Sequence, residues 1–120
     1  MIIVVEDVER LPQMIRAAER LAMPARVRIG LLLAGVSADH NAELDGNVRL
    51  LLPELAGAAV VPIGIVEHGI AHGTNGEVAE ALRRLDGGLI IARSGGLVVP
   101  ADGDIGSITA VLRCPLLLVR

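Results

Sequence analysis

The chain has 120 residues, which is enough for one domain with a single hydrophobic core. Its hydrophobic share of 52% and charged share of 21% exclude a disordered chain, because such chains bury too little apolar surface to offset the entropy of ordering. The net charge of −3 and the absence of Phe, Tyr and Trp argue against a protein that binds nucleic acid through basic surfaces and aromatic stacking.

No segment predicts membrane insertion or export. The longest apolar runs are the length of strands and are broken by Arg, Pro or Gly, and no basic region precedes Ile2 as in a signal peptide. The single Cys114 cannot form an internal disulfide and is more typical of a small buried hydrophobe than of a reactive thiol. We therefore expect a cytoplasmic protein.

Apolar blocks alternate with helical patterns along the chain. Residues 2–5 (IIVV) form a continuous β-branched run, which is typical of a strand covered on both faces and therefore central in a sheet. Residues 11–23 predict an amphipathic helix, with Pro12 in its first turn and Pro24 closing the pattern. Residues 27–34 predict a second buried strand.

The middle of the chain continues this alternation more weakly. Residues 43–55 predict a helix that Gly46 and Pro53 interrupt. Residues 59–66 predict a third strand. This strand should lie at the edge of the sheet, because Pro62 cannot donate a hydrogen bond to a neighbouring strand.

The last third begins with a helix signal. Thr74 and Glu77 have the spacing of a capping box and precede the helical pattern VAEALRRL. Two more strands are predicted at 89–92 and 116–119, separated by a loop and a short helix near residues 107–113.

This alternation predicts one α/β domain over residues 1–120, with a five-stranded, mainly parallel sheet and helices on both faces. Such sheets bind ligands outside the carboxyl ends of their strands, where the strand order reverses. With the first strand central, that crevice gathers the loop after it, Glu6 to Val8, and the loop after the fourth strand, Arg93 to Gly96.

Both ends of the chain resemble the universal stress protein family. Residues 2–22 (IIVVEDVERLPQMIRAAERLA) resemble the opening strand, turn and helix of the family. Residues 106–120 (GSITAVLRCPLLLVR) resemble its Gly-Ser helix start and its closing strand. The resemblance implies a three-layer domain of Rossmann-like or flavodoxin-like type, the sheet order 3-2-1-4-5 and, in many members, a homodimer.

Some members of this family bind ATP through a glycine, two residues, a second glycine, nine residues, and a glycine followed by Ser or Thr. On this chain the four positions are Arg93, Gly96, Gly106 and Ser107, so the spacing is kept while an arginine replaces the first glycine. Gly95 is adjacent but out of register with the pattern.

The first loop departs from the family as well. The acidic residue that lies near adenosine in ATP-binding members aligns with Glu6, and the family's Gly-Ser aligns with Asp7 and Val8. The resemblance thus implies a nucleotide or phosphate site, with ATP or AMP and Mg²⁺ as possible ligands, formed by Glu6, Asp7, Arg93, Ser94, Gly95, Gly96, Gly106 and Ser107.

Physical chemistry leaves two interpretations of this loop open. The guanidinium of Arg93 either blocks the site or adds a bidentate phosphate contact, and the amides of Gly106 and Ser107 would offer partial positive charge to an anion. Asp102 and Asp104 would repel phosphate unless Mg²⁺ bridged them. Alternatively the glycines are only turn residues and Ser107 is only a helix cap.

Other chemistry is weakly signalled. His68 and His72, in EHGIAHG, lack a third ligand nearby and are flanked by glycines that oppose a helix, so we expect no metal site. His40 should lie in a loop or at the start of a helix. The serines lack a nucleophile elbow, so no catalytic residue is assigned and at most weak ATP hydrolysis is expected.

The last strand should lie at an apolar sheet edge and pair with a second copy of the chain. Its residues are Leu116, Leu117, Leu118 and Val119. We predict a homodimeric, non-catalytic regulatory or ligand-sensing module of the stress response, with no membrane insertion. The alternatives are an ATP- or AMP-binding member with a phosphate loop at residues 93–107, and a cytoplasmic regulatory domain of a cation/proton antiporter.

Overall fold

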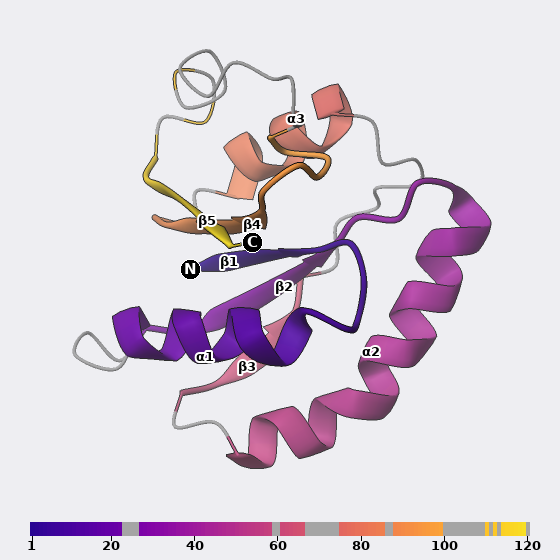
Figure 1. Cartoon of the computed structure of the whole chain (residues 1–120), viewed down its shortest axis with the longest axis vertical. Coiled ribbons are helices and arrows are strands. Elements are labelled where there is room, and N and C mark those ends of the chain that lie inside the picture. Colours follow the sequence, from indigo (N-terminus) through magenta and orange to yellow (C-terminus); the bar gives the residue numbers. More distant parts are fainter. Residues whose placement is uncertain are drawn as a thin grey trace.

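Five strands form one sheet in the order β3-β2-β1-β4-β5 in the computed structural model (Figure 1). Every neighbouring pair of strands is parallel, so the predicted fold class and strand order are confirmed. The structure describes residues 1–22, 27–58, 61–66, 75–85, 88–99, 110, 112 and 114–119. The strands are β1 (Ile2–Val5), β2 (Ile29–Leu33), β3 (Ile63–Ile65), β4 (Ile90–Arg93) and β5 (Leu116–Val119).

Helices cover both faces of the sheet, as predicted. Helices α1 (Leu11–Ala22) and α2 (Ala38–Ala58) lie on one face, and α3 (Asn75–Leu85) lies on the other (Figure 1). Successive residues of a strand point to opposite faces. Accordingly Ile3 and Val5 pack with α1 and α2, whereas the alternate residues of β1 pack with α3.

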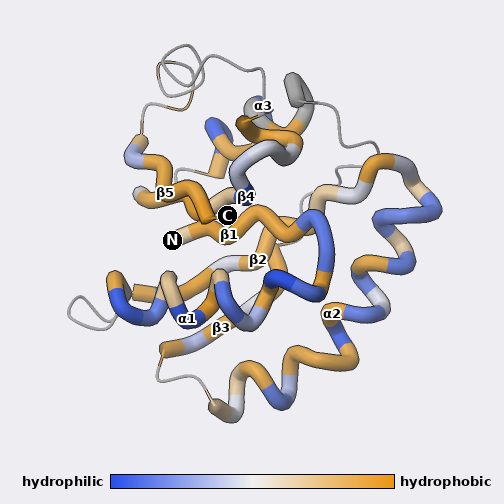
Figure 2. Tube along the Cα trace, in the orientation of Figure 1, coloured by the Kyte–Doolittle hydropathy of each residue, from blue (hydrophilic) through white to orange (hydrophobic). Residues whose placement is uncertain are grey.

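The central strand explains the unbroken IIVV run, because all four of its residues are buried. The core of the described residues contains only hydrophobic side chains and no buried polar or charged residue. Figure 2 shows the strands as hydrophobic and the turn between β1 and α1 as hydrophilic. The boundary between apolar sheet and polar crevice therefore lies at the end of β1.

Helix α2 is longer than predicted. It runs over Ala38–Ala58, through both Gly46 and Pro53, instead of ending and weakening at these residues. Buried Leu44 and Val48 hold the helix against the core, while Gly46 and Pro53 lie on its exposed side. Tertiary packing has outweighed the local cost of the glycine and the proline.

The third strand is shorter than predicted and comprises Ile63–Ile65 instead of 59–66. Pairing begins after Pro62, whose nitrogen cannot donate, and β3 lies at the edge of the sheet as expected. Of the predicted helix near 107–113, only residues 110 and 112 are described, and both are helical. Thr74, the first half of the predicted capping box, lies outside the described residues.

The helices of the described residues include none that is long and apolar enough to cross a membrane.

Candidate functional site

The loops that follow β1 and β4 meet at the carboxyl edge of the sheet. Strands β1 and β4 pair directly, with Ile3 opposite Ile91, so the two loops leave the sheet side by side. The Leu97 amide donates to Glu6 Oε1 at 3.0 Å. Arg93 Nη1 lies 3.6 Å from Asp7 Oδ2. The structure thus brings Glu6, Asp7 and Arg93 together, at the position where sequence reasoning placed the crevice.

The loop after β4 is a tight turn built on glycine. Gly95 has a positive φ of 76°, a conformation that glycine adopts without a steric penalty. The Gly95 amide donates to the Val99 carbonyl at 3.0 Å, and the Gly96 amide donates to the Arg93 carbonyl at 3.3 Å. Two of the loop's backbone amides are therefore satisfied within the loop.

Gly96 is needed for a different reason, because the Glu6 carboxylate approaches its backbone closely. The Glu6 carboxylate lies directly against its Cα, and a Cβ added to Gly96 would overlap Glu6 Oε2. A side chain at position 96 and a carboxylate in this place are therefore incompatible. The glycine pair serves two purposes, because Gly95 makes the turn and Gly96 admits Glu6.

Glu6 occupies an unfavourable environment for a charged group. Burial raises its pKa above the usual range, and this effect outweighs the hydrogen bond from the Leu97 amide and the nearby Arg93, both of which lower the pKa. Its Oε2 atom is buried and has no hydrogen-bond partner among the described residues. Among the described residues, Oε1 of Glu6 thus accepts a hydrogen bond and Oε2 accepts none.

Asp7 and Arg93 form a partly exposed ion pair across the crevice. Their side chains are 35% and 37% exposed, so solvent screens the pair and its contribution to stability is small. Asp7 Oδ1 also accepts from the Arg10 amide at 3.1 Å, in the turn that leads into α1. Arg93 Nε is buried and lacks a partner among the described residues. Arg93 therefore retains an unused donor beside the crevice.

The remaining predicted phosphate contacts, Gly106 and Ser107, lie outside the described residues, as do Asp102 and Asp104. Of the predicted loop, the structure describes residues 93–99. Within this part, Ser94 continues the line of β4, since its amide donates to the Val119 carbonyl at 2.9 Å. The crevice loop is in this way hydrogen-bonded to β5.

His40 has a structural role at the start of α2, as predicted. The Ser37 hydroxyl accepts from the His40 amide at 3.1 Å, and His40 Nδ1 accepts from the Val36 amide at 3.0 Å. Ser37 thus caps α2 as in the first half of a capping box, while the His40 side chain accepts from Val36, one residue before the N-cap. His68 and His72 lie outside the described residues, and the part that is described holds no cluster able to bind a metal. Cys114, predicted to be a small buried hydrophobe, is half-buried and packs against the α3 side of the core.

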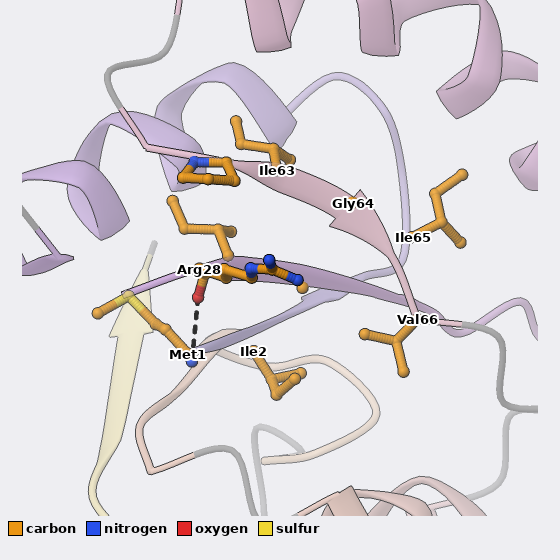
Figure 3. A pocket seen from close by; sticks show the side chains of 10 residues that line it. Met1, Ile2, Arg28, Ile63, Gly64, Ile65 and Val66 are labelled. Atoms are coloured by element: carbon orange, nitrogen blue, oxygen red, sulfur yellow. Dashed lines mark hydrogen bonds between the residues drawn. The ribbon is translucent and has the colours of Figure 1, made fainter. Parts of the chain in front are cut away.

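Sequence reasoning missed an apolar groove along β2 and β3, on the side of the sheet where Ile2 and Val66 pack (Figure 3). It has a volume of about 420 Å³. Gly30 and Gly64 are partners in register. The sheet is open at Gly64, whereas the Ile2 and Val66 side chains lie over Gly30. Arg28 is among the residues that line the groove (Figure 3). The two glycines are in the sequence, but only the register shows that they are neighbours.

A second hollow lies between α1 and β5 and has a volume of about 380 Å³. The α1 residues Gln13, Arg16, Ala17 and Arg20 line it, together with Val119 of β5. Helical periodicity places these α1 residues on one exposed face, but only the fold shows that this face adjoins the edge strand.

No protein-family model matches this sequence, and no curated protein sequence matches it either. Two solved structures are similar over nearly the whole chain. A protein of the universal stress protein family from Burkholderia pseudomallei is 19% identical with a TM-score of 0.54, and the match covers 98% of this chain and 94% of that one. A universal stress protein from Archaeoglobus fulgidus is 10% identical with a TM-score of 0.65, covering 99% and 91%. The predicted resemblance is confirmed at the level of the fold.

Proposed function

We propose that this chain is a non-catalytic, ligand-sensing regulatory module of the universal stress protein type, whose ligand binds in the crevice between the loops after β1 and β4. One observation carries the proposal: Glu6, Asp7 and Arg93 converge at the carboxyl edge of β1 and β4. This is where the strand order reverses and where open α/β sheets bind ligands.

An adenine nucleotide, ATP or AMP, is the ligand class that we propose first. Arg93 supports it, because a buried guanidinium nitrogen without a partner gains by donating to a phosphate oxygen. The partly exposed pair with Asp7 leaves this arginine accessible from the crevice. Arg93 would then be the phosphate contact instead of an obstruction.

A sensing role is proposed over catalysis because the two crevice carboxylates bond to the backbone. Glu6 binds the Leu97 amide and Asp7 binds the Arg10 amide. These bonds fix the two loops relative to each other and to α1. A bound ligand that altered them would change the shape of the crevice edge, which a partner protein could recognise.

We further propose that two copies associate through β5, in the cytoplasm and in response to stress. Strand β5 is the outer strand of the sheet and all four of its residues are half-buried. The Pro115 and Val119 carbonyls accept hydrogen bonds from Ile90 and Ser94, on the side of β4. Successive residues of a strand direct their backbone groups to alternate sides, so the amide and carbonyl of Leu118 face away from β4. An apolar edge of this kind favours pairing with another strand.

The ligand proposal is tested by thermal unfolding with ATP, AMP and inorganic phosphate, each with and without Mg²⁺. A ligand at about 100 times its Kd stabilises the folded state by about 2.7 kcal/mol, which shifts the Tm by several degrees. We expect Arg93→Gly to weaken the nucleotide shift and Arg28→Gly, the same change at an exposed position outside the crevice, to leave it intact. No shift of the wild type with either nucleotide, at neutral or at acid pH, would contradict a nucleotide ligand.

The dimer proposal is tested by light scattering on Leu118→Pro and Leu118→Ala. Proline removes the outward amide that a second copy would need, without removing a bond to β4. Alanine also removes most of the leucine side chain but keeps the backbone amide. We expect the proline variant to be monomeric and the alanine variant to remain dimeric. A wild type that is monomeric at all concentrations would refute the proposal.

A further inference from the structure

The crevice loop already holds an anion, and that anion is part of the chain. Glu6 Oε1 accepts from the Leu97 amide at 3.0 Å, and the same carboxylate lies against Gly96 Cα. A carboxylate in contact with a glycine Cα and a loop amide occupies the space that an external phosphate oxygen would need. The two anions cannot share this position, because they would overlap and repel each other.

The reach of the side chain makes this contact possible. Aspartate is one methylene shorter than glutamate, so an aspartate at position 6 would withdraw its carboxylate from Gly96 and the Leu97 amide. Glutamine has the length of glutamate without its charge. Glu6→Asp and Glu6→Gln therefore separate the contribution of side-chain length at position 6 from that of its charge.

We propose that Glu6 determines which ligands the crevice accepts: its carboxylate occupies the amide of the β4 loop and excludes phosphate groups until it is displaced or protonated. This inference rests on the proposed ligand site and specifies how that site is controlled. The phosphate group is the shared chemistry, whether it belongs to a nucleotide or is inorganic.

Protonation is a realistic way to release the loop. The charged groups that face Glu6 among the described residues are Asp7 and Arg10 from its own loop and Arg93 from β4. Burial dominates over the two arginines and raises the pKa of Glu6, so the carboxylate takes up a proton above the usual range for glutamate. Acidification should therefore weaken the hold of Glu6 on the Leu97 amide and increase phosphate affinity.

The test measures phosphate, AMP and ATP binding by calorimetry to wild type, Glu6→Gln, Glu6→Asp and Glu9→Gln, between about pH 7 and about pH 5. Glu9 is exposed in the same turn and provides a control for the change in net charge. We expect Glu6→Asp, which withdraws the carboxylate, to bind at least about tenfold more tightly than wild type near pH 7. Glu6→Gln, which loses the charge but keeps the length, should also bind more tightly than wild type, by a smaller factor. The affinity of the wild type should rise toward that of Glu6→Gln on acidification. The pH dependence of binding to Glu6→Gln measures the effect of the titration of phosphate itself and is subtracted.

The outcomes separate this inference from the proposed function. Wild type that binds nucleotide as tightly as both Glu6 variants would overturn the role of Glu6 and leave the ligand site standing. Equal gains in Glu9→Gln would also overturn it, because the effect would then be general electrostatics. Absence of binding in all four proteins would reject both. Inorganic phosphate and AMP arms that respond alike would assign the site to the phosphate group, and a response to nucleotide alone would assign it to the nucleotide.

A ligand-free readout keeps the inference testable if a variant folds poorly. In wild type, the amide signal of Leu97 in a nuclear magnetic resonance titration should follow the same protonation step as the Glu6 carboxyl. An amide signal that is insensitive to this step would show that Glu6 does not occupy the loop in solution, and would overturn the proposal.

Discussion

The interior of the sheet and its carboxyl edge are built on opposite rules, although only one or two residues separate them. In the interior, β1 is buried on both sides by hydrophobic neighbours and the described core holds no polar side chain. At the edge, Glu6 Oε2 and Arg93 Nε are buried without partners among the described residues. Folding alone would favour the first arrangement, because unpaired buried polar atoms cost stability. Residues that break the packing rule therefore mark the crevice as the part of the molecule shaped by something other than stability.

The largest loss of folding stability is expected when a buried hydrophobic side chain of the sheet interior is truncated. Leu32 in β2 is fully buried, so Leu32→Ala should destabilise the protein by about 2–5 kcal/mol through lost burial and the remaining cavity. Chemical denaturation measures this change. Leu50→Ala is the matched control, because Leu50 is 81% exposed and its loss should cost less than about 0.5 kcal/mol. Similar costs for both would contradict the described core.

A smaller effect is expected at the junction of the two loops. Gly96→Ala places a Cβ into the Glu6 carboxylate and should cost about 1–3 kcal/mol. Glu6→Ala in the same molecule removes the obstruction, so the double variant should recover much of this loss, as a double-mutant cycle would show. Gly64→Ala serves as the control, since a Cβ at Gly64 would meet open space. Additive effects of the two crevice substitutions would refute the contact.

The pH dependence of stability sharpens the same contrast. Because the pKa of Glu6 is raised in the folded state, the folded protein holds this proton more tightly than the unfolded chain does. The contribution of Glu6 to stability is then greatest in acid and is lost as the pH rises through the folded pKa. Glu6→Gln lacks this loss, so its free energy of unfolding relative to wild type should increase from about pH 4 to about pH 7. A constant difference would contradict the buried carboxylate.

The smallest effect is expected at the exposed helix surface. Glu80 lies 3.3 Å from Arg84 Nη2 and 3.4 Å from Arg83 Nη2, and all three side chains are largely solvent-accessible. Glu80→Gln should cost about 0.2–0.5 kcal/mol at low ionic strength and less in high salt. Denaturation at two salt concentrations measures it. A cost comparable to that of Gly96→Ala would mean that surface charge matters more here than the crevice contact.

Most of the fold could be predicted because its signals are local. The β-branched run at residues 2–5 predicted a buried central strand, and Pro62 predicted an edge strand, and both are confirmed. The length of α2 was not predictable from Gly46 and Pro53, since their local cost is overcome by Leu44 and Val48 packing on the core. Helix ends of this kind depend on tertiary contacts that no short window of sequence contains.

The candidate site was only partly predictable. Parallel topology alone was enough to place Glu6, Asp7 and Arg93 at one edge. No sequence pattern indicated that Glu6 bonds to the Leu97 amide, which lies 91 positions along the chain, or that Arg93 pairs with Asp7. Such contacts depend on side-chain reach and loop conformation, which are set by the completed sheet.

The position of β1 has a consequence for how the chain is made. Of the five strands, β1 is synthesised first, yet its second neighbour, β4, begins only at Ile90, which pairs with Ile2. During synthesis the apolar β1 can pair with β2, but its other edge stays open until β4 has emerged. Long-range parallel pairing of this kind slows folding and exposes strand edges to other chains. The nascent protein should therefore depend on chaperones or low temperature most strongly just before β4 is complete.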